Sequence, residues 1–305
     1  MTRPEATRAE ATRPEASAEP TITVIAPVWN GEREVGLLLD ALAAQTAPER
    51  AFEVIVVDNG STDGTADVLA RYPSIRVLRE PEPGSYRARN LAIRNARGRF
   101  LLFTDADCVP APDWVATALR LAERHGEDCV IGGRIELFRV GRTGRFSVRY
   151  EELTAFQQEW NLARGKCVTA NWLCSKRLLE SVGGFKDALL SGGDVECAQR
   201  IAAAGHAFVY APQMTVGHPT RATLLALARK RVRVTGGRWL KAGSPGVASF
   251  SRMVLDEHLA QARWMKGAAG DRLMRIGLLS IIASLWLVTQ LEILRLRTGA
   301  RPTRS

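Results

Sequence analysis

Two aspartates one residue apart end a short apolar run, and this arrangement is the one in the chain best suited to metal chemistry. The stretch Gly98–Cys108 starts with apolar residues and ends with Asp105 and Asp107. Neighbouring carboxylates repel each other unless they share a cation, and Mg²⁺ and Mn²⁺ prefer carboxylate together with phosphate oxygens. The pair therefore predicts a divalent metal site. The alternative is that these aspartates only cap the following helix.

Such carboxylates have to be placed at a ligand-binding edge by regular elements. Ligands of open α/β sheets bind outside the carboxyl ends of the strands. Apolar runs typical of strands alternate here with helical patterns, which predicts a mostly parallel sheet. The predicted strands are Thr21–Pro27, Phe52–Val57, Ile75–Leu78 and Phe100–Thr104. The predicted helices are Glu32–Gln45, Thr65–Arg71, Ser85–Asn95 and about Asp113–Arg124.

The composition limits the class of protein. Of the 305 residues, 46% are hydrophobic and 24% charged, which is typical of one large globular α/β domain or two smaller lobes. The net charge of +10 favours contact with phosphates of nucleotides, nucleic acid or anionic lipids. Five scattered cysteines without a CxxC pair favour reduced thiols in a cytoplasmic setting over a zinc site or a disulfide framework.

Residues 1–20 differ in composition from the rest of the chain. They are rich in Thr, Arg, Pro, Glu and Ala and contain no apolar core. Such a segment cannot bury enough apolar surface to order itself. We therefore expect a disordered tail rather than a signal peptide.

The turn after the first predicted strand, at residues 27–32, lacks the usual glycine-rich phosphate loops. A dinucleotide-binding domain would carry G-x-G-x-x-G at this place, but the sequence is PVWNGE. A P-loop motif, G-x-x-x-x-G-K-[ST], is absent from the chain as well. Any phosphates must therefore be held by a metal and by basic side chains.

Several motifs, in the same order, resemble those of the family 2 glycosyltransferases. The resemblance runs from Thr21 to about His218. The motifs are PVWNGE at 27–32, VVDNGSTDGT at 56–65, ARN at 88–90, DAD at 105–107, TAN at 169–171, VGGF at 182–185 and GGDVECAQR at 192–200.

This resemblance implies the GT-A fold, an α/β Rossmann-like fold with a mostly parallel sheet flanked by helices. A C-terminal helical, membrane-associating segment would follow it. We expect a nucleotide-sugar-binding half at residues 21–108 and an acceptor-binding half at 109–220. A basic and hydrophobic helical region is expected at 221–305.

The resemblance also implies which residues bind the donor. Asp58 would accept a hydrogen bond from the base, since an acceptor-only carboxylate suits the imide N–H of uracil or thymine. Trp29 would stack on the base or, alternatively, lie in the core. The guanidinium groups of Arg87 and Arg89 match phosphate geometry, with exposed helical positions as the alternative. The expected nucleotide-sugar-binding residues are Pro27, Trp29, Asn30, Glu32, Asp58, Arg87, Arg89, Asn90 and Asp105.

Asp194 is the general base that the resemblance implies. It would take the proton of the acceptor hydroxyl while that oxygen attacks the anomeric carbon in one inverting displacement. The alternative, which does not exclude the first, is a cap for the helix that follows. Gly193 departs from the family pattern, in which an acid often precedes this aspartate.

The remaining expected site residues bind the acceptor or the metal. The acceptor set is Asn171, Trp172, Glu196, Arg238 and Trp239. Its last two members lie in TGGRW, which is similar to the Q-x-x-R-W motif of processive synthases but lacks the Gln. His218 would complete the metal shell with Asp105 and Asp107, or else be a structural histidine. The expected cofactor is Mn²⁺ or Mg²⁺.

Residues 221–241 carry basic side chains and no acidic ones. Three interpretations stay open for this segment: a solvated basic face, a lid over the diphosphate, or a surface for anionic lipid. The basic residues are Arg221, Arg229, Lys230, Arg231, Arg233, Arg238 and Lys241.

Ile276–Leu291 contains no charged residue and has arginines on both sides. As a helix it spans roughly 24 Å, less than a hydrocarbon core of about 30 Å. A spanning helix would also place one arginine cluster on the wrong side of the membrane. We expect a helix on or in the cytoplasmic leaflet, with a single span, or burial in the fold or in an oligomer, as alternatives.

Taken together, the residues and the resemblance predict a metal-dependent, inverting glycosyltransferase at the cytoplasmic face of the cell membrane. Its partners would be a nucleotide-diphosphate-sugar donor, a lipid-linked or glycan acceptor and an anionic membrane surface. Nucleic acid is not expected, because no recognition motif supports it. The alternatives are a nucleotidyltransferase of related fold and a non-catalytic sugar-nucleotide-binding scaffold protein.

Overall fold

The computed structural model describes residues 19–303 apart from 142, 244 and 269. Of the tail expected at residues 1–20, residues 1–18 therefore lie outside the described part of the chain. The strands are β1 (Ile22–Val28), β2 (Phe52–Asp58), β3 (Arg76–Arg79), β4 (Phe100–Phe103), β5 (Val109–Pro110), β6 (Cys129–Phe138), β7 (Trp172–Ser175) and β8 (Ala207–Pro219). The α-helices are α1 (Val35–Ala43), α2 (Thr65–Leu69), α3 (Ser85–Asn95), α4 (Trp114–His125), α5 (Arg145–Thr154), α6 (Gln158–Leu162), α7 (Lys176–Ser181), α8 (Gly193–Ala203), α9 (Leu224–Lys241), α10 (Val247–Ala268) and α11 (Arg272–Arg297).

The predicted alternation of strands and helices up to residue 125 is confirmed. Each predicted element is present with bounds that differ by a few residues, because end residues are weakly specified by pattern alone. The strand predicted at Ile75–Leu78, for example, is Arg76–Arg79. Apolar periodicity was thus enough to place this half of the fold.

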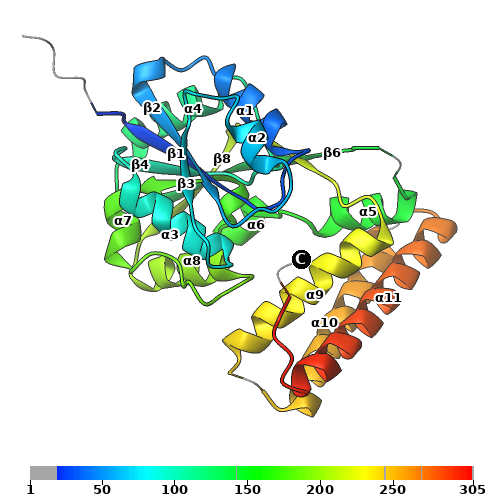
Figure 1. Cartoon of the computed structure of the whole chain (residues 1–305). Coiled ribbons are helices and arrows are strands. Elements are labelled where there is room, and N and C mark those ends of the chain that lie inside the picture. Colours follow the sequence, from blue (N-terminus) through cyan, green and yellow to red (C-terminus); the bar gives the residue numbers. More distant parts are fainter. Residues whose placement is uncertain (1–18, 142, 244, 269, 304–305) are drawn as a thin grey trace, which may run out of the picture.

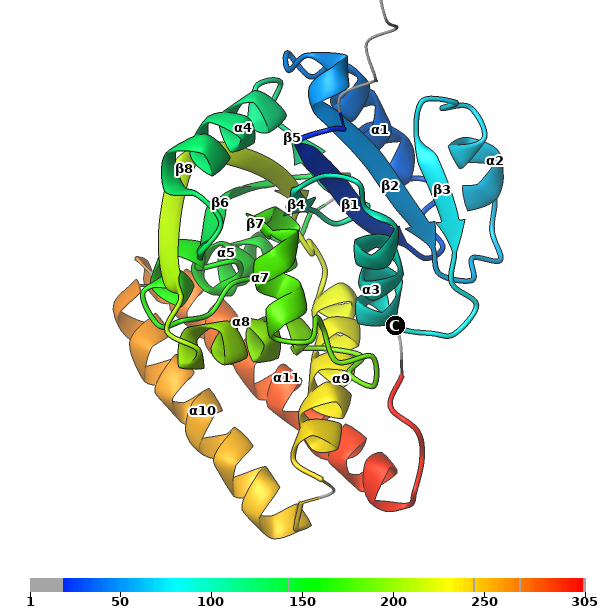
Figure 2. The same cartoon turned by 90° about the vertical axis from the view of Figure 1, so that its left-hand side faces the viewer.

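One mixed sheet organises the protein, in the order β3-β2-β1-β4-β7-β6-β8-β5. Strands β1 to β4 pair in parallel, as predicted. Antiparallel strands enter with β7, which pairs with β4 and β6, whereas β6 and β8 run parallel to each other. Figure 2 shows β1 to β3 lying side by side on one half of this sheet. The sheet is mostly parallel, as expected for the GT-A fold.

Helices cover both faces of the sheet and bury a hydrophobic core on each. On one face, Val35 and Leu38 of α1 and Trp114 of α4 pack against alternate residues of β1. On the other face, α3, α7 and α8 pack against the strand residues whose side chains point to that face of the sheet. Because both faces are buried, β1 is apolar along nearly its whole length.

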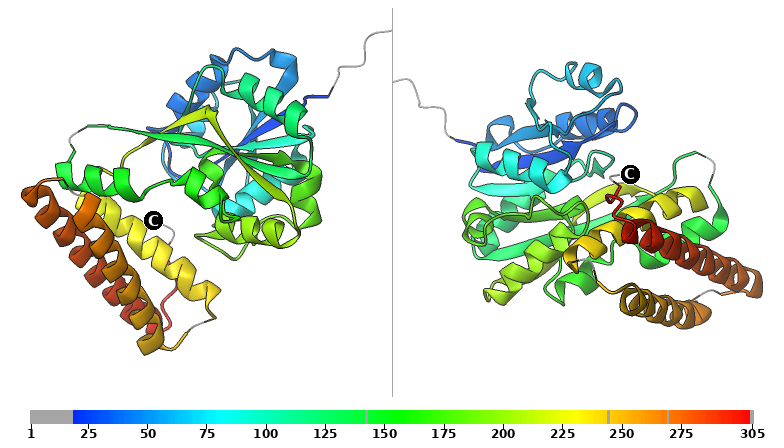
Figure 3. Two further views of the ribbon diagram at one scale, coloured as in Figure 1. Left: turned by 180° about the vertical axis from the view of Figure 1, so that it is seen from behind. Right: turned by 60° about the horizontal axis from the view of Figure 1, so that its bottom comes forward.

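The last three helices form a separate layer with cores of their own. One core joins α5, α9, α10 and α11, and a smaller one joins Trp239, Phe250 and Ile293. Figures 1 and 3 show the three helices together beside the sheet, with α9 nearest to it. Helix α9 therefore separates the sheet from the apolar helix α11.

Helix α11 is longer than the charge-free stretch at its centre. Its 26 residues make it long and apolar enough, by length and composition, to cross a membrane, although 44% of its most apolar window is buried inside the protein. The prediction from Ile276–Leu291 alone underestimated its length, because the helix continues through the arginines at both ends. Packing on α9 and α10 buries one side of the helix and leaves the other exposed.

Candidate active site

A cleft of about 1000 Å³ lies at the carboxyl edge of the sheet, between the sheet and helix α9. The turn after β1, the segment after β4, the start of α3, the start of α8, the end of β8 and α9 all contribute residues to its lining. This is the edge at which α/β proteins bind ligands, because the loops that follow parallel strands meet there. The cleft is therefore the candidate active site.

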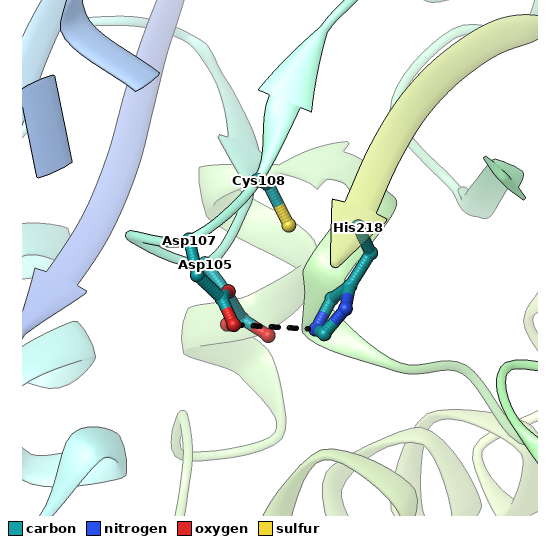
Figure 4. A group of neighbouring side chains, drawn as sticks. All are labelled: Asp105, Asp107, Cys108 and His218. Atoms are coloured by element: carbon teal, nitrogen blue, oxygen red, sulfur yellow. Dashed lines mark ion pairs between the residues drawn. The ribbon is translucent and has the colours of Figure 1, made fainter. Parts of the chain in front are cut away.

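Asp105, Asp107 and His218 come together in this cleft from two different strands. One ligand atom from each of these residues and from Cys108 lies within 4.8 Å of those of the others. Figure 4 shows the two carboxylates and the imidazole ring pointing toward one another. The two aspartates predicted as metal ligands and the histidine predicted to join them are thus adjacent.

The hydrogen bonds of His218 fix which of its nitrogens faces the aspartates. Its Nδ1 lies 2.8 Å from the carbonyl oxygen of Pro219, which can only accept, so Nδ1 carries the proton. In the neutral ring Nε2 then has a lone pair, and it lies 3.6 Å from Oδ2 of Asp107. A lone pair facing a carboxylate is unfavourable, and either a proton on Nε2 or a cation held between the two groups relieves it.

The surroundings of Asp107 also suit a cation. Burial raises the pKa of Asp107 above its ordinary value, and Asp105 adds to this effect, while His218 and Arg221 oppose it. Cys108 is fully buried, and burial raises the pKa of its thiol well above the usual range. Cys108 is therefore a neutral thiol when no metal is bound, and the group also offers two carboxylates and one imidazole, donors that suit a divalent cation.

Arg89, predicted to pair with a diphosphate, is instead engaged with the first aspartate. Its side chain is buried on α3, and its Nη2 donates to Oδ1 of Asp105 at 2.5 Å. A charged hydrogen bond of this kind holds the carboxylate in one orientation. Arg89 still lines the cleft, but the exposed helical position considered as the alternative is wrong.

Asp194 lies in the first turn of α8 and lines the same cleft as the metal group. Its Oδ1 accepts hydrogen bonds from the backbone N–H of Val195 and from the hydroxyl of Tyr86. Burial raises the pKa of Asp194 above its ordinary value, although the Val195 N–H, the Arg89 charge and the Tyr86 hydroxyl oppose this. A carboxylate whose pKa is raised toward neutrality is suited to general base catalysis.

The turn after β1 forms the end of the cleft away from α8. Pro27, Trp29 and Asn30 line it, and Trp29 is 41% exposed, so the core alternative for Trp29 is wrong. Asn30 has a φ of 49°, and its side-chain oxygen accepts from the backbone N–H of Thr62. Glu32 accepts from the N–H of Gly64 and does not line the cleft. These contacts tie the turn after β1 to the turn after β2.

Asp58 ends β2 next to this turn. It is 3% exposed, accepts from the N–H of Ser61 and lies 3.7 Å from the guanidinium of Arg79. The following residue, Asn59, lines the cleft, whereas Asp58 itself does not. The structure therefore buries the side chain of Asp58 directly before the cleft residue Asn59 in the sequence, and its predicted role toward a base stays a prediction.

Several residues predicted to contact ligands are used in internal contacts. Asn90 binds the backbone of Phe185 and the carboxylate of Asp187, and Arg87 lies 4.0 Å from that same carboxylate. Glu196 is paired with Lys186 and Arg200. None of these three predicted residues lines the cleft in the part of the chain that the structure describes.

Two predicted acceptor residues are buried in the protein. Asn171 bonds to the carbonyls of Arg134 and Met214, and Trp172 packs on Phe103. Both are fully buried, so neither has a surface with which to meet an acceptor. The Asn171 amide satisfies buried carbonyl groups, and the Trp172 ring fills space in the core.

Arg238 and Trp239, the other predicted acceptor residues, belong to the helical layer. Arg238 forms a bidentate pair with Glu257 of α10, and Trp239 is buried against Phe250. Neither lines the cleft. Their likeness to the acceptor motif therefore does not place them near the acidic residues.

Other residues line the cleft that sequence reasoning did not assign to it. Tyr86 contacts Asp194, and Phe156, at a φ of 46°, lies against the ring of His218 at 4.4 Å between centroids. Neither position carries a chemical signal in the sequence, since both look like ordinary apolar positions. Only the tertiary contacts reveal them.

The basic segment contributes three cations to the cleft, which we call the basic wall: Arg221, Lys230 and Arg233. It faces the acidic wall, which consists of Asp105, Asp107 and Asp194. The position of these three cations favours the lid interpretation over a purely solvated face. Their presence in one segment was visible in the sequence, but their direction was not.

A single buried carboxylate binds two of the three cations of the basic wall. Glu151 of α5 is fully buried and binds both the backbone and the side chain of Arg221 and, at 3.2 Å, Nζ of Lys230. Burial alone would raise the pKa of Glu151, but the charges of Lys230 and Arg221 outweigh it and lower that pKa. Burial in turn lowers the pKa of Lys230 to about 8, with Arg221 adding to the effect.

Comparison with known sequences identifies the family. The sequence model described as Glycosyl transferase family 2 matches residues 23–183. Glycosyltransferase AglE from Haloferax volcanii is 34% identical over 228 residues, which cover 73% of this chain and 74% of that protein. Pre-mycofactocin glycosyltransferase from Mycobacterium tuberculosis is 27% identical and is matched over 72% of this chain and 47% of its own length.

Solved structures share the fold. Mannosyltransferase PcManGT from Pyrobaculum calidifontis, in complex with GDP-Man and Mn²⁺, superposes with a TM-score of 0.59 at 22% identity, covering 94% of this chain and 90% of that one. Residues 1–349 of TarS from Staphylococcus aureus, in complex with UDP-GlcNAc, give a TM-score of 0.54 at 20% identity, with 92% of each chain covered. The family model covers more than half of the chain and AglE aligns over nearly three quarters of it, so this protein belongs to glycosyl transferase family 2 and is a glycosyltransferase.

Proposed function

We propose that this enzyme transfers a sugar from a nucleotide-diphosphate-sugar donor to a hydroxyl of a lipid-linked or glycan acceptor, with inversion at the anomeric carbon and in the presence of Mn²⁺ or Mg²⁺. One observation carries the proposal. The half-buried carboxylate of Asp194 opens into the same cleft as Asp105, Asp107 and His218. A base and a metal-ligand group in one cavity are what a single displacement at a sugar diphosphate requires.

In the proposed step Asp194 takes the proton of the acceptor hydroxyl. The acceptor oxygen forms a bond to the anomeric carbon while the bond from that carbon to the phosphate oxygen breaks. The nucleoside diphosphate leaves with the electron pair of the broken bond. Because one nucleophile enters opposite one leaving group, the anomeric configuration inverts.

The charge that develops on the leaving diphosphate needs a cationic environment. The basic wall provides it from the side of α9, where Arg221, Lys230 and Arg233 line the cleft. Asp105, Asp107 and His218 would hold the divalent cation, which when bound neutralises diphosphate oxygens. Arg89 keeps Asp105 in place for this role.

Donor recognition is proposed for the turn after β1. The exposed ring of Trp29 offers a stacking surface, and Pro27 and Asn30 shape the wall beside it. Asp58 at the end of β2 would accept a hydrogen bond from the base. The relatives with bound donors hold UDP-GlcNAc or GDP-Man, so uridine and guanosine donors are the first to test.

We propose further that an anionic membrane surface covers the exposed side of α11. Leu273, Ile276, Leu287, Leu291 and Leu294 are each more than half exposed, and their successive spacings of 3, 11, 4 and 3 residues put them on one side of the helix. Arg272 and Arg275 lie at the start of this side and Arg297 follows it. An apolar stripe with basic ends suits the boundary between anionic headgroups and acyl chains.

The packing of α11 favours a position along the cytoplasmic leaflet over a single span. Its buried side contacts α9 and α10, and α9 carries Lys230 and Arg233 of the basic wall and further arginines. A spanning α11 would draw these charges toward the hydrocarbon, at a cost of roughly 2.5–3.5 kcal/mol for each at the bilayer centre. An interfacial α11 leaves them in water.

Calorimetric titration of UDP-GlcNAc, GDP-mannose and the corresponding dTDP and CDP sugars tests the proposed function. Each donor is added with Mn²⁺, with Mg²⁺ or with a chelator, to wild type, to Asp107→Ala and to the control Asp67→Ala. Asp67 is exposed and lies outside the cleft. We expect one donor to bind with metal and to lose that binding in Asp107→Ala alone.

The product distinguishes the remaining candidates. Release of a nucleoside diphosphate supports sugar transfer, whereas release of pyrophosphate would indicate a nucleotidyltransferase. Donor binding without turnover on any lipid-linked or glycan acceptor would favour a scaffold role. Equal donor binding with metal and with chelator would contradict metal dependence.

A further inference from the structure

Gly193, the departure from the family pattern, lies directly against Tyr86. A Cβ atom at position 193 would come within 2.7 Å of Cδ2 and Cε2 of the Tyr86 ring, closer than real Cβ contacts. Gly193 is the first residue of α8 and has no positive φ, so its backbone does not require glycine. The space that a side chain would occupy is what matters at this position.

The ring that fills this space is held firmly. Tyr86 is 5% exposed and packs on Phe185, with 5.7 Å between the two ring centroids. The guanidinium carbon of Arg89 lies 5.6 Å from the centroid of the Tyr86 ring. Contacts on two sides leave the phenol one direction in which to point. Its hydroxyl reaches Oδ1 of Asp194 at 3.1 Å.

The two carboxylate oxygens of Asp194 differ in the hydrogen bonds that they accept. Within the described part of the chain, the Tyr86 hydroxyl and the Val195 N–H both donate to Oδ1. This leaves Oδ2 as the oxygen with accepting capacity toward the cleft that Asp194 lines. Burial raises the pKa of Tyr86 far above the range in which it could ionise, so the phenol remains a donor.

We propose that Tyr86 is a positioning residue for Asp194, and that Gly193 is required because any side chain there would displace the phenol from the carboxylate. This inference rests on the proposed role of Asp194 as general base. The hydroxyl would fix the carboxylate so that Oδ2 meets the acceptor hydroxyl, and Tyr86 would keep its own proton throughout the transfer. In this chain a tyrosine from α3 thus takes the place next to the base where relatives often carry an acid.

The first test removes only the hydroxyl. Tyr86→Phe keeps the ring and its packing, so thermal unfolding should stay within about two degrees of wild type. The turnover number for hydrolysis of the bound donor by water, followed as nucleoside diphosphate release, should fall tenfold to a hundredfold, roughly the worth of a hydrogen bond to a charged group. The KM for the donor should stay within about twofold, since Tyr86 acts on the base and not on donor affinity.

Tyr72→Phe is the matched control. The Tyr72 hydroxyl donates to Oδ1 of Asp40 at 2.7 Å, an exposed tyrosine–aspartate pair that lies outside the cleft. Its removal should leave turnover at the wild-type level. A fall in turnover for Tyr72→Phe as large as that for Tyr86→Phe would overturn the assignment.

The second test is a double-mutant cycle on the pair. Gly193→Ala should lower both the unfolding temperature and turnover in the presence of Tyr86. The same change in a Tyr86→Ala background should have little further effect, because the ring with which the added methyl group would collide is gone. Additive effects on the unfolding temperature would show that the two residues do not compete for space and would overturn that part of the proposal.

Asp194→Asn separates this inference from the proposed function. If Asp194→Asn retains wild-type turnover, Asp194 is not the base and the proposed function fails first. If Asp194→Asn is inactive but Tyr86→Phe turns over at the wild-type rate, the proposed function stands and the positioning role of Tyr86 is wrong.

Discussion

The acidic wall and the basic wall face each other across one cleft but are built in different ways. Asp105 and Asp107 follow the parallel strand β4, so their positions follow from the sheet, and Asp194 lies in the first turn of α8, which packs on the sheet. Lys230 and Arg233 instead lie on α9 and Arg221 just before it, and Arg221 and Lys230 share one buried carboxylate, Glu151. The acidic wall is thus fixed by the sheet and by a helix packed on it, whereas two of the three cations of the basic wall depend on a single charged group.

This difference has an energetic consequence. Strand pairing spreads the cost of a substitution over many backbone hydrogen bonds, so single changes in the acidic wall should alter chemistry more than folding. A buried ion network has no such reserve, because removing one member leaves uncompensated charge. We therefore expect the acidic wall to fail in function and the basic wall to fail in stability.

The largest expected effect lies on the acidic wall. Asp194→Asn should lower donor turnover by about a thousandfold, within the range that general base catalysis contributes. Donor affinity measured by calorimetry in the presence of Mn²⁺ should not change, because Asp194 is not in the metal group. A large loss of donor affinity would place Asp194 among the donor-binding residues instead.

The next effect lies beneath the basic wall. Glu151→Gln should lower the free energy of unfolding by about 3 kcal/mol at pH 7, because Arg221 and Lys230 lose their buried counter-charge. Urea unfolding followed by circular dichroism measures this. The exposed neighbour Glu152→Gln, whose ion pairs lie at the surface, should change the same quantity by less than about 1 kcal/mol.

The pH dependence of stability gives the same network a second test. The pKa of Glu151 is lowered in the folded protein, so its stabilising contribution is present above its unfolded pKa and is lost as the pH falls through the lower, folded value. Wild type should therefore lose stability relative to Glu151→Gln in acid. Parallel stability curves for the two proteins below pH 5 would contradict this network.

A smaller effect is expected at the outer side of the helical layer. Leu287→Glu together with Leu291→Glu should weaken binding to vesicles of mixed phosphatidylcholine and phosphatidylserine by about tenfold, because apolar area is lost from the interface. Co-sedimentation measures this, with the exposed Val77→Glu on β3 as the control. Wild-type vesicle binding by the double variant would contradict a membrane contact through α11. A dimer in light scattering that the double variant abolishes would show that a second copy of the chain covers this side of α11.

The smallest effect concerns the charge of Lys230. Its pKa of about 8 means that the ammonium form, which attracts phosphate, is lost as the pH rises through that value. Donor affinity should therefore fall about threefold between pH 7 and pH 9, roughly the worth of one partly screened charge. Lys230→Arg, which keeps its charge in this range, should flatten the curve.

Much of the fold followed from the sequence because its signals are local. Apolar runs that alternate with helical patterns placed β1 to β4 and the helices between them within a few residues. The antiparallel strand β7 was not predicted, since its short run Trp172–Ser175 is too brief to distinguish a strand from a helix. The length of α11 was also missed, because charged residues at its ends resemble helix limits.

The candidate site divides in a similar way. Asp105, Asp107, His218 and Asp194 were identified by residue type and motif and do meet in one cleft. Asn171, Trp172 and Trp239 were assigned by motif to the acceptor but are buried, because a motif does not state which side of an element a side chain takes. Tyr86 and Phe156 were missed for the opposite reason, since their contacts join residues far apart in the chain.

The sequence by itself determined the alternating elements, the family and the chemical groups at the strand ends, because all of these depend on residue type and short spacing. Tertiary structure alone decided which cations face the acidic wall, how Glu151 holds them, and why glycine precedes Asp194. These features depend on contacts between segments such as α3 and α8 or α5 and α9. Their distances are set by packing of the whole chain, which no local pattern encodes.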